Sequence, residues 1–71
     1  MNNELKAIIL ARDDAVRKAW ASLAGYKFLM FGYHAARFVN YNKLLDREHR
    51  VGSPFTPLVT LARKYRVIYD K

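Results

Sequence analysis

The stretch from residue 19 to residue 39 constrains this chain most, because it carries apolar side chains around nearly its whole helical circumference. At helical spacing one face presents the apolar set Ala24, Phe28, Phe31, Ala35, Phe38 and Val39. The opposite face presents Tyr26, Met30, Tyr33 and Leu44. A helix of this kind either lies inside a large core or contacts something outside the chain. Because a chain of 71 residues cannot wrap it, we expect the second face to contact a partner.

The length of the chain predicts one domain, residues 1–71, of marginal stability. Below about 70 to 80 residues a hydrophobic core is usually supplemented by disulfides, a bound metal or oligomerisation. The sequence contains no cysteine, which excludes a disulfide framework and a thiolate metal site and is typical of a cytoplasmic protein. Self-association is therefore the expected supplement, and we predict a homo-oligomer.

The charge of the chain favours acidic partners. Thirteen Lys and Arg residues against six Asp and Glu residues give a formal net charge of +7. A field of this sign attracts an acidic protein or a nucleic acid. A membrane span is not expected, because Lys27 lies at the centre of the apolar stretch, where a charge costs about 2.5 to 3.5 kcal/mol on insertion scales. The first apolar run, residues 7–11, is too short for a secretion signal.

The hydrophobic periodicity predicts an all-α domain of three helices with a long central helix. The first helix begins at Asn2 or Asn3, whose side chain can accept a backbone N–H. The central helix covers residues 24–45 and packs on both flanking helices. After a loop at residues 48–57, the last helix covers residues 57–68. Its buried face is expected to contain Leu58, Leu61, Ala62, Tyr65 and Ile68.

Two features of the helical pattern need a structural reason. A glycine inside a helix costs about 1 kcal/mol relative to alanine. A break at Gly25 and a close helix crossing at Gly32 would account for both glycines, although the sequence leaves open whether the first two helices are continuous. Arg12 falls within the apolar stripe of the first helix, and we expect its aliphatic stem at the core edge and its guanidinium in water.

The sequence carries no motif of an enzyme, so we predict a protein with no catalytic site and no cofactor. Neither serine belongs to a nucleophile motif, and no glycine-rich phosphate loop is present. Asp46, Glu48 and His49 place two carboxylates and an imidazole within four residues, which we interpret as a solvated helix end rather than a metal site. His34 is interpreted as a packing residue.

Three segments, residues 24–28, 30–39 and 54–63, resemble short proteins encoded by bacteriophages and prophages. They read AGYKF, MFGYHAARFV and PFTPLVTLAR. The resemblance implies a biological context and no site residue. Small phage proteins of this kind often bind a host protein, a defence protein or a nucleic acid rather than catalyse a reaction.

These observations favour a non-enzymatic helical module that self-associates and binds an acidic macromolecule. The expected interface with a second copy or a partner consists of Tyr26, Met30, Tyr33, Arg37 and Leu44. The expected contacts to an acidic partner are Arg37, Lys43, Arg63, Lys64 and Arg66. The alternative is a basic nucleic-acid-binding protein, in which the same cations bind phosphates and the aromatic residues stack on bases.

Overall fold

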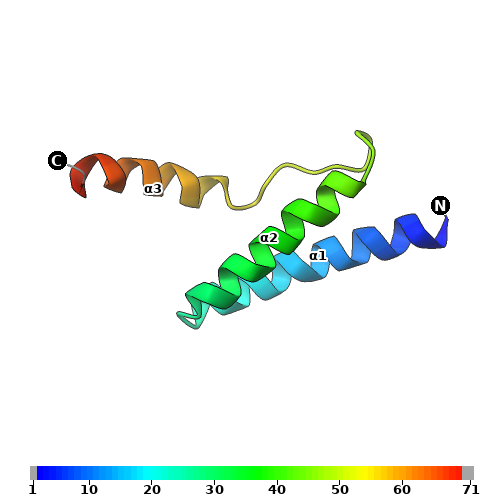
Figure 1. Cartoon of the computed structure of the whole chain (residues 1–71), viewed down its shortest axis with the longest axis horizontal. Helices are drawn as coiled ribbons and strands as arrows, with labels where there is room; N and C mark the ends of the chain where they lie inside the picture. The colour runs from blue at the N-terminus through cyan, green and yellow to red at the C-terminus, as the bar shows by residue number, and fades with distance from the viewer. Residues whose placement is uncertain (1, 70–71) are drawn as a thin grey trace.

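The computed structural model describes residues 2–69, with the backbone alone described for Tyr69. Within this range the chain forms three helices and no strand: α1 (Asn3–Ala24), α2 (Phe28–Leu44) and α3 (Thr56–Tyr69). As Figure 1 shows, α1 and α2 form a helical hairpin, and α3 extends away from it at the end of a long connection. The radius of gyration is 14.3 Å, against about 11 Å for a compact domain of this length. The all-α class is confirmed, in an elongated molecule.

The beginning of α1 follows the prediction. Asn2 is the N-cap residue, and its side-chain oxygen accepts a hydrogen bond of 2.6 Å from the backbone N–H of Leu5. Glu4 lies in the first turn, where a negative charge interacts favourably with the helix dipole.

The turn between α1 and α2 answers the question that the sequence left open, because the helix breaks after Ala24. The backbone N–H of Lys27 donates to the Ser22 carbonyl at 2.8 Å, and that of Tyr26 donates to the Leu23 carbonyl at 3.0 Å. These two bonds define a Schellman motif, which ends a helix with one residue in the left-handed conformation. That residue is Tyr26, with φ 61°, and not the neighbouring Gly25.

The core lies between α1 and α2 and is small. Its buried residues are Ala15 and Ala19 of α1, Phe38 of α2 and Phe55 of the connection. The two alanines let the helices approach closely, and the aromatic rings fill the remaining space. The Phe55 ring packs against three other aromatic rings, with centroid distances of 5.2 Å to Trp20, 5.5 Å to Phe31 and 5.9 Å to Phe38.

The connection at residues 45–55 is fixed to the hairpin by hydrogen bonds. The side chain of Asn42 donates to the Val51 carbonyl at 3.0 Å and accepts from the Val51 N–H at 3.1 Å. The Arg50 guanidinium donates to the carbonyls of Leu45 and Lys43 at the end of α2. With Phe55 in the core, this connection is part of the folded hairpin.

Arg12 corrects one prediction. Its guanidinium does not reach water, since the residue is 6% exposed. Nη1 donates to the His49 carbonyl at 2.7 Å, and Nε donates to the Asp13 carboxylate at 3.0 Å. Arg12 therefore joins α1 to the turn that follows α2, and a carbonyl from a distant part of the chain takes the place of solvent.

The predicted central helix is also corrected. α2 has 17 residues and α1 has 22, so the middle helix is not the longest. Within residues 2–69, α1 and α2 are the helices that pack on each other, and α2 does not lie between two neighbours. Three residues expected in the core, Ala24, Phe28 and Val39, are accordingly exposed. The expected close crossing at Gly32 is wrong, because a Cβ atom built there would meet nothing within 4 Å.

The expected burial of α3 is wrong for most of the helix. Leu58 in its first turn packs against the core cluster, but Leu61, Ala62, Tyr65 and Ile68 are all exposed. The bounds of α3 agree with the predicted ones to within one residue. The periodicity therefore predicted the helix and its amphipathic character correctly, but it did not predict which elements α3 contacts.

In the described range, no helix combines the length and the hydropathy needed to cross a bilayer.

Candidate interaction surfaces

The exposed stripe of α2 is the first candidate surface. Tyr26, Met30, Tyr33 and Leu44 all lie on the surface of the folded chain, with Tyr26 81% and Tyr33 59% exposed. Met30, Tyr33, Arg37 and Leu44 follow one another at three, four or seven residues, which places them in one line along α2, and Tyr26 lies in the turn just before the helix. We call these five residues the Tyr33 stripe. Solvent-exposed aromatic and Met side chains in one line are typical of protein interfaces.

Arg37, in the middle of this stripe, contacts three other side chains of α2. Its guanidinium carbon lies 5.8 Å from the Tyr33 ring centre and 5.7 Å from the Tyr41 ring centre, within the range of cation–π contacts. Its Nη1 donates to Nδ1 of the buried His34 at 3.0 Å. Because arginine can only donate, this contact requires Nδ1 of His34 without a proton. His34 is thus a packing residue, as predicted, and it orients a charged group of the surface.

Tyr26 is held at the tip of the hairpin at an energetic cost. A non-glycine residue in the left-handed region costs roughly 1 to 2 kcal/mol. Its ring is exposed and makes an edge-on contact with the exposed Phe28, at a centroid distance of 6.1 Å. An aromatic side chain is thus presented to solvent at a backbone position that glycine would occupy without strain.

We expect the substitution Tyr26→Gly to stabilise the isolated hairpin, because glycine adopts positive φ freely. The gain is about 0.5 to 1 kcal/mol after the entropy of glycine in the unfolded chain is subtracted. Urea unfolding followed by Trp20 fluorescence at low protein concentration measures it. Lys27→Gly is the matched control, since Lys27 has φ −89° and glycine there brings its entropic cost without relief of a left-handed backbone. Unfolding at lower urea for Tyr26→Gly would contradict the strain argument.

The second candidate surface is α3. The helix carries Arg63, Lys64 and Arg66 and no acidic residue between positions 56 and 69. All three cations are exposed, next to the exposed apolar residues of the same helix. The other predicted contacts to an acidic partner, Arg37 and Lys43, lie on α2. Because α3 packs on neither helix of the hairpin in the described range, the structure places the five predicted cations on two separate surfaces.

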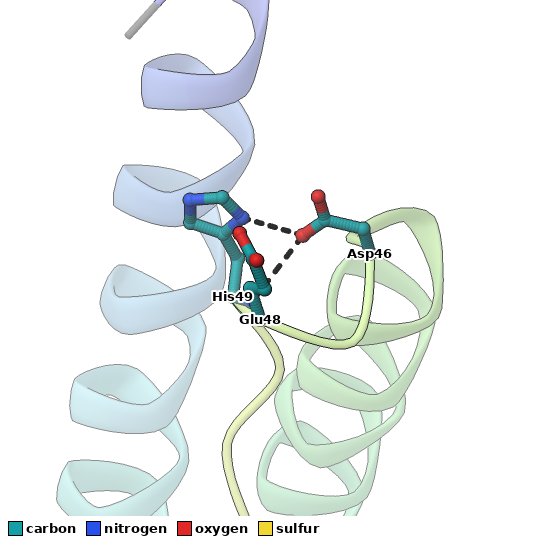
Figure 2. Close-up of side chains that lie close together, drawn as sticks. All are labelled: Asp46, Glu48 and His49. Atoms are coloured by element: carbon teal, nitrogen blue, oxygen red, sulfur yellow. Dashed lines mark hydrogen bonds and ion pairs between the residues drawn. The ribbon is translucent and has the colours of Figure 1, made fainter.

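The side chains of Asp46, Glu48 and His49 gather at the turn after α2 (Figure 2). Asp46 accepts hydrogen bonds from the ring Nδ1 and from the backbone N–H of His49, and the second of these is 3.3 Å long. The bond from the His49 side chain is the main cause that lowers the pKa of the Asp46 carboxyl below 3.8. Both carboxylates are exposed. One ligand atom from each of the three side chains lies within 4.8 Å of the other two, a spacing at which they could hold a metal ion. The interpretation of the cluster as a solvated helix end therefore stays a prediction.

An open cleft lies between α1, α2 and the connection, and no sequence motif predicted it. It has a volume of about 350 Å³ and is lined by Asp13, Val16, Phe38, Val51, Gly52 and Pro54. The lining is mostly apolar. It forms because Asn42 holds Val51 next to the hairpin, and that contact spans nine residues without a periodic signal.

Two further apolar residues are exposed in the fold and do not belong to the surfaces predicted from the sequence. Leu29 is 91% exposed beside the Tyr33 stripe, and Leu10 of α1 is exposed as well. Leu29 follows Phe28 directly, so helical geometry places it between the face of α2 that packs on α1 and the Tyr33 stripe. The sequence predicts where Leu29 lies around the helix. Its exposure, however, depends on tertiary structure, because no third helix covers α2 in the described range.

The total surface is larger than that of a typical folded monomer. The chain exposes 5714 Å², while a compact monomer of 8.3 kDa exposes about 4,600 Å². The difference, about 1,100 Å², exceeds the roughly 800 Å² that each partner contributes to a standard protein interface.

Comparison with protein-family models, with curated proteins and with solved structures finds no match for this chain.

Proposed function

We propose that this protein is a non-enzymatic helical interaction module that self-associates through the Tyr33 stripe and binds an acidic macromolecule with its basic residues. The observation that carries the proposal is the exposed apolar surface of α2 in a chain whose own core is small. Burial of apolar surface stabilises by about 25 cal/mol per Å², so coverage of this stripe by a second copy supplements a marginal fold. The resemblance to small phage proteins is compatible with binding a host or defence protein.

The net charge separates the two activities experimentally. Two copies that each carry +7 repel each other, and salt screens this repulsion. Self-association through an apolar stripe is therefore expected to strengthen when the salt concentration rises. Binding to an acidic partner is expected to weaken under the same change, because salt screens an attraction there.

We expect Tyr33→Glu to dissociate the assembly, because it places a charge in the middle of the apolar contact. The dissociation constant should rise at least about tenfold, and helix content should stay the same because Tyr33 is exposed. Sedimentation velocity at micromolar concentration measures this. Ala7→Glu on the exposed part of α1 introduces the same charge and is the matched control. A wild-type chain that sediments as a folded monomer would overturn the self-association.

The acidic partner is either a protein or a nucleic acid, and a binding experiment distinguishes these two classes. Titration with labelled single-stranded and double-stranded DNA and RNA at two ionic strengths tests the alternative function. Binding to these probes that weakens steeply with salt favours a nucleic-acid-binding protein. The absence of binding at low salt excludes that alternative and leaves an acidic protein as the partner class.

A further inference from the structure

We propose that α3 is a docking helix that inserts its apolar face into an open apolar groove of an acidic protein. This inference rests on the proposed function. It specifies which helix binds the acidic partner and to which class of macromolecule that partner belongs. The face consists of Leu61, Ala62, Tyr65 and Ile68, and we call it the α3 face. Leu61, Tyr65 and Ile68 are 49%, 50% and 51% exposed.

The hairpin of the same chain does not cover the α3 face. Phe55 is held among three aromatic rings in the core, and α3 begins at the next residue. The connection before Phe55 is fixed by the bonds of Asn42 and Arg12. No free length of chain therefore remains between the core and the helix to let α3 fold back. The helix projects about 21 Å, the length of 14 residues in α-helical geometry.

The spacing of the α3 face fits insertion into a groove. Leu61, Tyr65 and Ile68 follow one another at four and three residues, which is how an amphipathic helix presents its anchors to a partner groove. Aliphatic anchors gain nothing from a phosphate backbone, so a nucleic acid would satisfy the cations of α3 and leave these side chains in water.

The charges around the α3 face select an acidic partner. By helical geometry Lys64 borders one edge of the face and Arg66 borders the other, and residues 56–69 contain no carboxylate side chain. The charged residues of α2 are also all cationic, namely Arg37 and Lys43. A second copy that docked its α3 or α2 here would place cations opposite cations, which is unfavourable. A groove bordered by Asp and Glu side chains complements both the apolar face and its edges.

Calmodulin is a suitable probe, because it is acidic and opens a methionine-rich groove when it binds calcium. Its calcium-free form keeps the acidic chain with the groove closed, and so controls for charge alone. By isothermal titration calorimetry, we expect the full chain to bind calcium-loaded calmodulin with a dissociation constant of about 1 μM or lower. Binding to the calcium-free form should be at least about tenfold weaker.

Two substitutions at adjacent positions separate the apolar contact from the charge. Leu61→Asp and Thr60→Asp change the net charge equally, but Thr60 lies on the opposite side of α3 and is exposed. Leu61→Asp should weaken the complex at least about tenfold and Thr60→Asp less than about threefold. Because Leu61 does not belong to the core, the hairpin should keep its unfolding curve in both variants, and circular dichroism checks the helix content.

The following results would overturn the inference. Equal binding to both calmodulin forms, or equal losses for the two variants, would show that charge alone acts, and the proposed binding of acidic macromolecules would stand without a docking helix. The absence of binding to either form also overturns it. Co-sedimentation with phosphatidylglycerol vesicles without binding to calmodulin would assign α3 to a membrane surface. Dissociation of the assembly by Leu61→Asp would assign the α3 face to a second copy. A monomeric wild type, by contrast, rejects the proposed self-association and leaves this inference intact.

Discussion

Replacement of Phe55 by alanine is expected to lower the free energy of unfolding by about 3 to 5 kcal/mol. Phe55 is buried, and its ring contacts Trp20, Phe31 and Phe38, so the truncation removes apolar contacts and leaves a cavity between the two helices. Small domains have a total stability of about 5 to 15 kcal/mol, which makes this loss a large part of the whole. The connection that carries α3 should detach from the hairpin at the same time.

Urea unfolding of the Phe55→Ala variant, followed by the fluorescence of Trp20, measures this loss. The single tryptophan lies 5.2 Å from the Phe55 ring and reports directly on its environment. Phe28→Ala is the matched control, because it removes the same atoms from a side chain that is 62% exposed. It should change stability by less than about 1 kcal/mol. Protein concentration must be equal in all runs, since association raises apparent stability. Similar losses for both variants would contradict the described position of Phe55.

Arg12→Met is expected to lower the free energy of unfolding by about 2 to 3 kcal/mol, since hydrogen bonds to charged groups contribute about 1.5 to 3 kcal/mol. Methionine keeps much of the apolar stem but cannot donate to the His49 carbonyl or to Asp13. The turn at residues 46–50 then loses its link to α1. Faster amide hydrogen exchange at residues 46–51 should accompany the loss of stability.

Arg17→Met is the control for Arg12→Met. Arg17 also bonds a carboxylate, with Nη2 at 2.6 Å from Asp14, but its side chain is 71% exposed. Surface ion pairs contribute about 0 to 1 kcal/mol, so this variant should unfold close to the wild type. A buried ion pair can sometimes be replaced by apolar residues without loss. If Arg12→Met were as stable as Arg17→Met, the bond to the His49 carbonyl would be of no consequence for the fold.

Local signals in the sequence predicted the helices well. Asn2 provides a side-chain acceptor for the first turn of α1, and Pro57 follows the first residue of α3. A break at Gly25 was one of two possibilities that the sequence left open, and α1 does end there, with Tyr26 as the left-handed residue. Each of these features depends on a few neighbouring residues, and the sequence therefore contains the information directly.

The position of α3 could not be predicted in the same way. Helical periodicity shows that one face of α3 is apolar but does not say what covers it. The decisive residue is Phe55, an isolated aromatic between Pro54 and Thr56 in a segment without periodicity. The same reason explains Arg12, whose hydrogen-bond acceptor lies 37 residues further along the chain. Long-range contacts made by single residues leave no pattern in the sequence.

The candidate surfaces were predicted in part. The residues of the Tyr33 stripe were selected because two short neighbours cannot cover a helix that is apolar all round, and four of the five are exposed in the folded chain. Their role in association stays a prediction. The five predicted cations are divided between α2 and α3 in the fold. This division depends on the separation of the helices, which no local signal encodes.

The attachment of α3 through Phe55 has an evolutionary consequence. Beyond its first turn, the described side chains of this helix contribute nothing to the core, so substitutions there are free of the packing constraints that limit α1 and α2. Mutations can therefore accumulate in α3 while the hairpin continues to fold. The proposed docking face can thus diverge between descendants of this chain at little cost to the fold.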